Sequence, residues 1–121
     1  MPLFRTIGKL ENVNFKDLKE LDLSYTNISN IKVLEKVKFE KLEKLNLHWN
    51  NISNIDILEN VNFKELKELN LRNNNISNIK VLEKVKFNKL EKLDLSKNKI
   101  DEIKFSSVIN TLKSRNIKFE Y

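Results

Sequence analysis

Leucine and isoleucine recur along this chain in a pattern that repeats every 24 residues. In each copy two leucines flank one polar residue, as in LNL at 45–47, which predicts a short strand with one side turned inward. Apolar residues then follow at a spacing of three, as at Ile28, Ile31, Leu34 and Val37. That spacing predicts a 3₁₀-like arc. The pattern therefore predicts strands that alternate with short arcs.

Each copy begins at a phenylalanine, and these lie at Phe15, Phe39, Phe63 and Phe87. Self-similarity with such a period is typical of solenoids, in which each repeat packs on its neighbours. We predict a single domain, 1–121, with repeats at 15–38, 39–62, 63–86 and 87–110. Residues 1–14 resemble the second half of a repeat, and 105–121 predict a capping helix and strand. Ser106 is the expected N-cap of that helix and Asn116 its expected end.

The segment LEKLNLHWNNI at 42–52 resembles the core of the leucine-rich repeat, L-x-x-L-x-L-x-x-N-x-I. The preceding phenylalanines are similar to the phenylalanine spine of typical members. The resemblance implies an α/β-type solenoid: a right-handed coil with a parallel sheet on its concave face and short 3₁₀ or helical arcs on its convex face. The first repeat departs from the pattern, because Thr26 stands where the others have asparagine. We therefore expect the ladder of asparagines at this position (Asn50, Asn74, Asn98) to begin one repeat late.

The copies differ most at one place. Residues 15–47 and 63–95 are identical at 26 of 33 positions, and the three sharp differences are consecutive, at 24–26 against 72–74. The first two of these differences fall on the two positions between the last strand leucine and the asparagine, and the third falls on the asparagine position itself. The first column of such residues is Ser24, His48, Arg72 and Ser96, and the second is Tyr25, Trp49, Asn73 and Lys97.

These eight residues are our candidate partner-binding site. The resemblance implies that the concave surface binds another protein, and the two columns lie on it and at its rim. Tyrosine, tryptophan and arginine are enriched among interface hot spots, and Tyr25, Trp49 and Arg72 bring all three together. Tyr25 and Trp49 would be neighbours within stacking distance. The simpler interpretation is that Trp49 only packs along the rim against Tyr25.

Charged residues beside the strands alternate in sign from repeat to repeat. In a parallel stack Lys19, Glu43, Lys67 and Glu91 form one column. The adjacent column, of opposite phase, is Glu20, Lys44, Glu68 and Lys92. We interpret these columns as a device that sets the register of the repeats, since unlike charges meet at every step.

Other chemistry finds little support. Ser24 and His48 lack an evident orienting acid and oxyanion donor, so we predict no enzyme. One histidine and the column Asp22, Asn46, Asn70 and Asp94 make a poor metal site, and we expect these side chains to bond to each other instead. No cofactor is expected. The net charge of +6 is a reason to consider nucleic-acid binding. However, the lysines are dispersed and the concave face carries both positive and negative charges, so we do not expect it.

The chain has no cysteine, and its start lacks the apolar core of a signal peptide, so we expect a cytoplasmic protein without membrane contact. A competing hypothesis is a structural or self-assembling scaffold, a fragment of a longer array or an idealised repeat protein, that associates through an open N-terminal end. We expect a monomer or weak end-to-end self-association.

Overall fold

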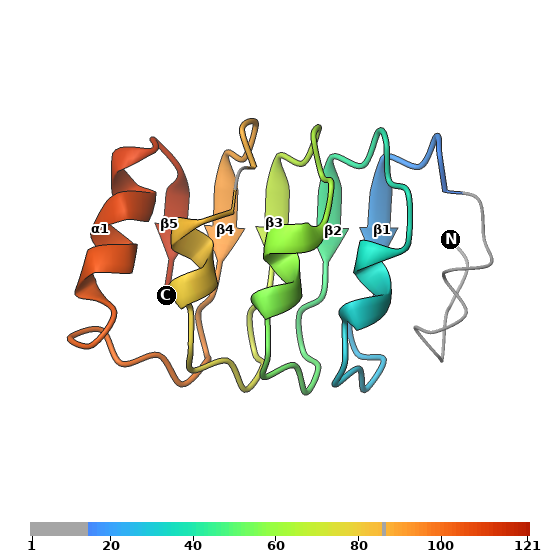
Figure 1. Cartoon of the computed structure of the whole chain (residues 1–121). Helices are drawn as coiled ribbons and strands as arrows, with labels where there is room; N and C mark the ends of the chain where they lie inside the picture. Colours follow the sequence, from blue (N-terminus) through green and yellow to red (C-terminus); the bar gives the residue numbers. More distant parts are fainter. Residues whose placement is uncertain (1–14, 86) are drawn as a thin grey trace.

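The computed structural model describes residues 15–85 and 87–121, and shows a coil of stacked repeats (Figure 1). Five parallel strands pair in chain order: β1 (Glu20–Asp22), β2 (Lys44–Asn46), β3 (Glu68–Asn70), β4 (Lys92–Asp94) and β5 (Lys118–Glu120). Three 3₁₀ helices lie on the opposite side: η2 (Lys32–Glu35), η3 (Asp56–Asn60) and η4 (Lys80–Glu83). One α-helix, α1 (Ser106–Ser114), packs against η4. The predicted sheet and arcs are confirmed, whereas the partial repeat at 1–14 lies outside the described residues.

The strands pair in a register of one repeat. Leu21 lies opposite Leu45, Leu45 opposite Leu69, and Leu69 opposite Leu93. Each of these leucines is buried, as is the leucine two residues later in each of the four repeats. Because equivalent residues stack on each other, the core consists of columns in which a side chain packs on its own copy in the next repeat. The phenylalanine spine is such a column, with successive ring centroids 5.6, 5.7 and 5.9 Å apart.

Asparagine starts the arcs, which explains how a chain with one glycine turns so often. The side-chain oxygens of Asn30, Asn54 and Asn78 accept hydrogen bonds from the backbone N–H groups two residues later, at 2.8, 2.9 and 3.0 Å. Each of these contacts closes an Asx turn at the first residue of a 3₁₀ helix. The turns therefore depend on asparagine carboxamides.

A second set of asparagines forms the predicted ladder inside the coil. Asn74 Nδ2 donates to the carbonyls of Leu47 and Leu71 at 3.1 and 3.0 Å, and Asn74 Oδ1 accepts from the Ile52 N–H at 3.0 Å. One side chain thus binds the backbone of its own repeat and of the preceding one. Asn50 and Asn98 make the equivalent bonds. These bonds satisfy backbone groups that the turn leaves without partners.

Thr26 is confirmed as the departure from this ladder. Its hydroxyl donates to the carbonyl of Leu23 in its own repeat at 2.6 Å. Its backbone N–H and hydroxyl both contact Asn50 Oδ1, at 3.2 and 3.3 Å. A threonine has no second donor with which to reach another repeat. The described ladder therefore begins at Asn50.

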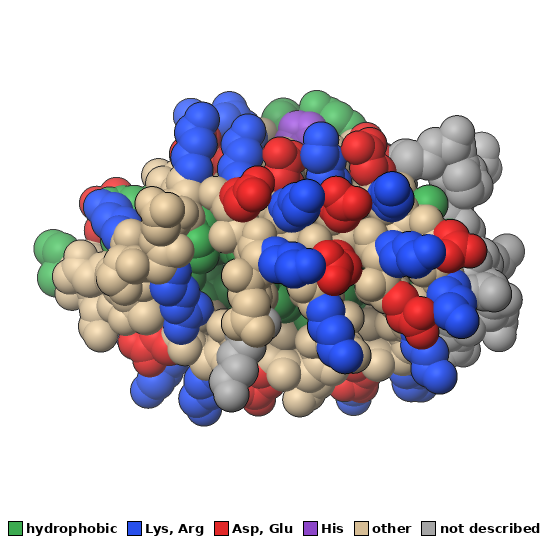
Figure 2. Space-filling model, turned by 90° about the horizontal axis from the view of Figure 1, so that it is seen from above, with side chains coloured by type: hydrophobic (Ala, Val, Ile, Leu, Met, Phe, Trp, Pro, Cys, Tyr) green, Lys and Arg blue, Asp and Glu red, His purple; other side chains and the backbone are tan. Residues whose placement is uncertain are grey.

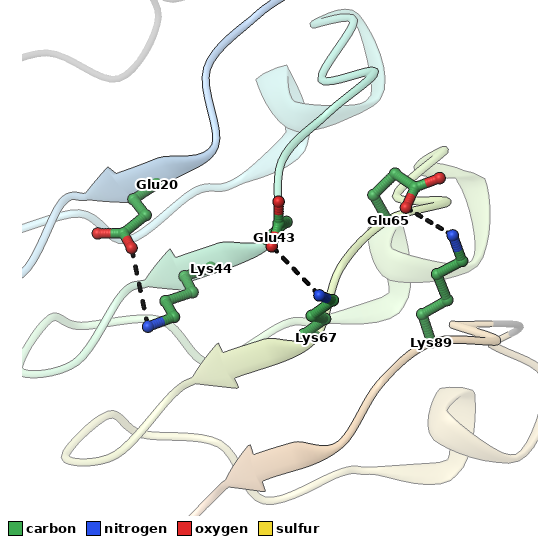
Figure 3. A network of polar contacts seen from close by, with 6 residues as sticks. All are labelled: Glu20, Glu43, Lys44, Glu65, Lys67 and Lys89. Atoms are coloured by element: carbon green, nitrogen blue, oxygen red, sulfur yellow. Dashed lines mark hydrogen bonds and ion pairs between the residues drawn. The ribbon is translucent and has the colours of Figure 1, made fainter.

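Within the described residues, each of the two predicted charge columns forms one ion pair between neighbouring repeats. Lys44 Nζ lies 3.7 Å from Glu20 Oε1, and Lys67 Nζ lies 3.4 Å from Glu43 Oε1 (Figure 3). Figure 2 views the molecule from the edge of the sheet at which the strands begin, and lysine and acidic side chains alternate along rows there. Surface pairs of this kind contribute little individually, but a register shift of one repeat would juxtapose like charges throughout.

A further column was missed in the sequence. Lys41 Nζ lies 3.1 Å from Asp17 Oδ1, and Lys89 Nζ lies 2.7 Å from Glu65 Oε2. The hydrogen bond from Lys89 lowers the pKa of the Glu65 carboxyl below its ordinary value. Asp17, Lys41, Glu65 and Lys89 alternate in sign like the other columns. The alternation stops at the last strand, where Lys92 lies opposite Lys118 and Asp94 opposite Glu120.

The end of the chain forms a helix and a strand. The expectation that Ser106 caps the helix is wrong: the N-cap is Phe105, which has no side chain able to cap, and Ser106 is the first helical residue. Asn116 follows the helix with φ 60°, a left-handed conformation that asparagine tolerates well, so its predicted role is confirmed. Arg115 donates to the carbonyls of Leu82, Glu83 and Val85 and so ties the helix end to η4.

We predict that Asn74→Ala lowers the free energy of unfolding by roughly 3 kcal/mol, because it leaves buried carbonyls and an N–H group without partners. The adjacent Asn75→Ala is the matched control, because Asn75 is exposed and its change should stay within about 0.5 kcal/mol. Urea denaturation of both variants measures the difference. Equal effects would mean that the ladder does not stabilise the coil.

The charge columns make a second prediction. Lys44→Glu places a carboxylate between Glu20 and Glu68, and should destabilise the protein by up to about 1 kcal/mol at low salt. Adding Glu20→Lys and Glu68→Lys should restore part of the loss, although these changes create new contacts at the ends of the column. In about 1 M salt, where the Debye length is ~3 Å, the loss should shrink. A loss independent of salt would argue against an electrostatic register device.

Candidate functional site

Each of the strands β1 to β4 is followed by a turn that holds a left-handed residue at the same position of the repeat. Tyr25, Trp49, Asn73 and Lys97 have φ of 57, 58, 57 and 58°. The fold therefore imposes this conformation whichever residue is present. Asparagine adopts it readily, whereas other residues with a Cβ do so at a cost of roughly 1–2 kcal/mol. Asn73 fits the turn, but Tyr25 and Trp49 occupy it against their preference.

The residue before the turn is held by the last strand residue. The side-chain oxygens of Asp22, Asn46, Asn70 and Asp94 accept hydrogen bonds from the backbone N–H groups of Ser24, His48, Arg72 and Ser96, respectively, at 2.9–3.0 Å. The expectation that the polar column bonds within itself is therefore corrected, because each member closes its own Asx turn. These turns place both candidate columns identically in every repeat.

The two predicted columns are real columns in the structure. The Tyr25 N–H donates to the His48 carbonyl at 3.3 Å, and the Trp49 N–H donates to the Arg72 carbonyl at 2.9 Å. The backbone ladder thus continues past the strands into the turns. Residues of the first column are half-buried, while Tyr25 and Trp49 in the second are 65% and 53% exposed.

Three aromatic side chains meet at the rim of the first two repeats. The Tyr25 and Trp49 rings stack with centroids 5.5 Å apart and an interplanar angle of 24°. The His48 ring meets both at an edge, 5.0 Å from the Tyr25 centroid and 6.4 Å from that of Trp49. His48 Nδ1 is buried there and has no hydrogen-bond partner within the described part of the chain. The cluster is thus an aromatic platform, on which Tyr25 and Trp49 are exposed.

The remaining candidates lie farther along the same surface. Arg72 Nη1 donates to Ser96 Oγ at 3.4 Å, so the guanidinium is directed toward the fourth repeat. Lys97 is exposed at the end of the second column. The structure therefore separates an aromatic part, on the first two repeats, from a basic part that begins at Arg72.

Other chemistry has no matching geometry at these residues. Ser24 Oγ donates to Asp22 Oδ1 at 2.5 Å, so this hydroxyl is directed at its own turn and not at His48. A serine nucleophile needs a hydrogen bond to its base. Among residues 15–85 and 87–121, no cluster of three potential metal-ligating His, Cys, Asp or Glu side chains occurs. No helix in this part is both long and apolar enough to cross a membrane.

A groove beside the platform contains residues that the sequence analysis missed. It has a volume of about 470 Å³, and we call it the rim groove. Its lining consists of Tyr25, Asn27, Trp49, Asn50, Asn51, Asn73, Asn74 and Asn75. Asn27, Asn51 and Asn75 are identical in three repeats, so a search for differences between copies could not detect them.

Comparison with known families agrees with this geometry. Models described as leucine-rich repeats match residues 16–31, 41–61 and, as two copies, 64–111. The chain belongs to the leucine-rich repeat family. No curated protein is similar enough to this leucine-rich repeat chain to count as a match.

Solved structures of other leucine-rich repeat proteins share the fold. An internalin (inlF) of Listeria monocytogenes has a TM-score of 0.72 and 27% identity over 95% of this chain. Internalin C2 of the same bacterium has a TM-score of 0.70 and 26% identity over 96%. A leucine-rich repeat protein of Leptospira interrogans has a TM-score of 0.71 and 20% identity over the whole of this chain. The chain spans only 31, 46 and 34% of these three structures.

The left-handed turn gives a prediction at Lys97, which has no aromatic partner in the column. Lys97→Asn should stabilise the protein by roughly 1 kcal/mol, because asparagine tolerates positive φ. Lys97→Val, with a β-branched side chain, should destabilise it by more than about 1 kcal/mol. Thermal and urea denaturation measure both. If the two variants were equally stable, the turn would not restrict residue choice.

Proposed function

We propose that this leucine-rich repeat protein binds another protein through the sheet face and its rim, at the two columns around Tyr25, His48, Trp49 and Arg72. The observation that carries the proposal is the stacked, exposed Tyr25–Trp49 pair on left-handed backbone. Large exposed aromatic side chains are typical anchors in interfaces. Family membership supports the coarser statement, because leucine-rich repeats are typically non-enzymatic scaffolds for protein interaction.

Stability arguments also favour binding over simple packing. Three unfavourable features coincide at this site: Tyr25 and Trp49 have positive φ, and the buried His48 Nδ1 has no hydrogen-bond partner among the residues that the structure describes. Each lowers stability. The third repeat fills the equivalent positions with Arg72 and Asn73, and so has no aromatic side chain there. An arrangement that opposes stability is most simply explained by a binding role.

The neighbouring surface provides polar contacts around the aromatic anchor. A shallow hollow of about 310 Å³ lies on the sheet face, lined by Glu20, Leu21, Asp22, Lys44, Leu45, Asn46, Glu68 and Asn70. Its side chains carry both signs of charge, and some are already paired within the molecule. A partner would therefore meet an aromatic centre with a polar, mixed-charge surround, as interfaces commonly have.

The test is affinity capture from an extract of the source cell, with bound proteins identified by mass spectrometry. The site variant combines Tyr25→Asn, Trp49→Asn and Arg72→Ser, which introduce residues found at equivalent positions in other repeats. The matched control changes three exposed residues that form one column on the opposite side of the coil. It combines Lys32→Ala, Asp56→Ala and Lys80→Ala. We expect a partner retained by wild type and control but lost by the site variant.

With a partner in hand, Trp49→Asn alone should weaken binding roughly 30-fold, the effect of a hot spot of about 2 kcal/mol. Capture of the same proteins by all three baits would overturn the proposal. Light scattering at increasing protein concentration tests the competing scaffold hypothesis. Growth in size without a partner would favour self-association, whose proposed N-terminal site falls on residues 1–14, outside the described residues.

A further inference from the structure

The free face of Trp49 opens into the rim groove. Tyr25, in the preceding repeat, covers one face of the indole by stacking. The opposite face is therefore turned along the coil toward the third repeat. There the column continues with Asn73, whose short side chain leaves the indole face uncovered, and both residues line the groove.

The groove also presents unused hydrogen-bonding groups. Asn50 and Asn74 are engaged in the ladder, and Asn51 Nδ2 donates to Asn27 Oδ1. The carboxamides of Asn73 and Asn75 have no hydrogen-bond partner within the described part of the chain. Each carboxamide has two donor hydrogens and one acceptor oxygen close together. They can therefore bind a ligand group that both donates and accepts.

The lining selects against charged ligands. None of the eight lining residues carries a charge, although the chain as a whole has a net charge of +6. A ligand suited to this groove has a flat face of C–H groups for the indole and neutral polar groups along its edge. A proline-rich segment docks between aromatic residues, but the stacked Tyr25 and Trp49 rings, 5.5 Å apart, leave no slot between them.

We propose that the rim groove binds a neutral oligosaccharide. A pyranose ring has one face of C–H groups, which the electron-rich face of an indole attracts, and its edge carries adjacent hydroxyls. One hydroxyl donates and accepts at once, which matches the carboxamides of Asn73 and Asn75. The volume of about 470 Å³ lies within the range usual for small-ligand sites. This inference shares Tyr25, Trp49 and Asn73 with the proposed protein-binding surface but does not require a protein partner.

The test uses Trp49 as its own reporter, because it is the only tryptophan in the sequence. Its fluorescence is followed while neutral oligosaccharides of glucose, galactose, mannose or N-acetylglucosamine are added to the full chain. A proline-rich peptide is titrated in parallel. We expect saturable changes in emission with at least one sugar, and none with the peptide.

Two variants locate the site. Asn73→Gly with Asn75→Ala should weaken sugar binding at least tenfold, because it removes the hydrogen bonds and leaves the indole in place. Glycine is compatible with positive φ at 73, so this variant should still fold. Lys80→Ala is the control: Lys80 is exposed on η4, on the opposite side of the coil, and does not line the groove, so sugar binding should persist.

The proposal is overturned if no sugar changes the emission up to roughly 10 mM, the weak end of measurable binding. It is also overturned if the peptide binds instead, or if the Asn73 and Asn75 variant binds sugar like wild type. Failure here leaves the protein-binding proposal standing, since that proposal depends on capture lost with Tyr25, Trp49 and Arg72. Conversely, if the capture experiment finds no partner but the protein still binds a sugar, the sugar-binding proposal stands and the protein-binding proposal fails.

Discussion

The structure depends on an asparagine carboxamide that joins each of the second, third and fourth repeats to the one before it. Asn50, Asn74 and Asn98 each donate to carbonyls in two successive repeats and accept an N–H from the preceding turn. Apolar columns alone would tolerate sliding and rotation, because hydrophobic contact has no direction. The hydrogen bonds are directional, and leaving them unmade is costly. They therefore fix where each strand ends and where its turn begins.

Because the ladder fixes the turn, it also fixes the surface. The backbone between strand and ladder must adopt positive φ, whether the residue is tyrosine, tryptophan, asparagine or lysine. Side chains at this position project in the same direction from every repeat, so a change of residue alters the surface without altering the coil. The aromatic platform and the rim groove are two consequences of this geometry: Tyr25 and Trp49 build the platform, and the small Asn73 opens the groove beside it.

Electrostatics adds a second level of order. Unlike charges face each other between neighbouring repeats in the column Asp17, Lys41, Glu65 and Lys89, and in the two columns nearer the strands. The pairing has a period of two repeats, whereas the core has a period of one. The core therefore cannot distinguish a shift by one repeat, but the charges can. At β5 the alternation ends, with Lys118 opposite Lys92.

The sequence by itself determined the fold. The 24-residue period, the alternation of leucines and the ladder asparagines specify the structure within each repeat, and the stacking of repeats follows from it. It also located Tyr25, His48 and Trp49, since near-identical copies make any sharp difference visible. It could not reveal the left-handed turns, the direction of Arg72 toward Ser96, or the groove beside Trp49. Those features arise where residues 24 positions apart meet side by side. Asn75 looks like its copies at Asn27 and Asn51 in the sequence, and all three line the groove. Only the stacking of the repeats decides that Asn51 and Asn27 bond to each other, whereas the carboxamide of Asn75 has no hydrogen-bond partner within the described part of the chain.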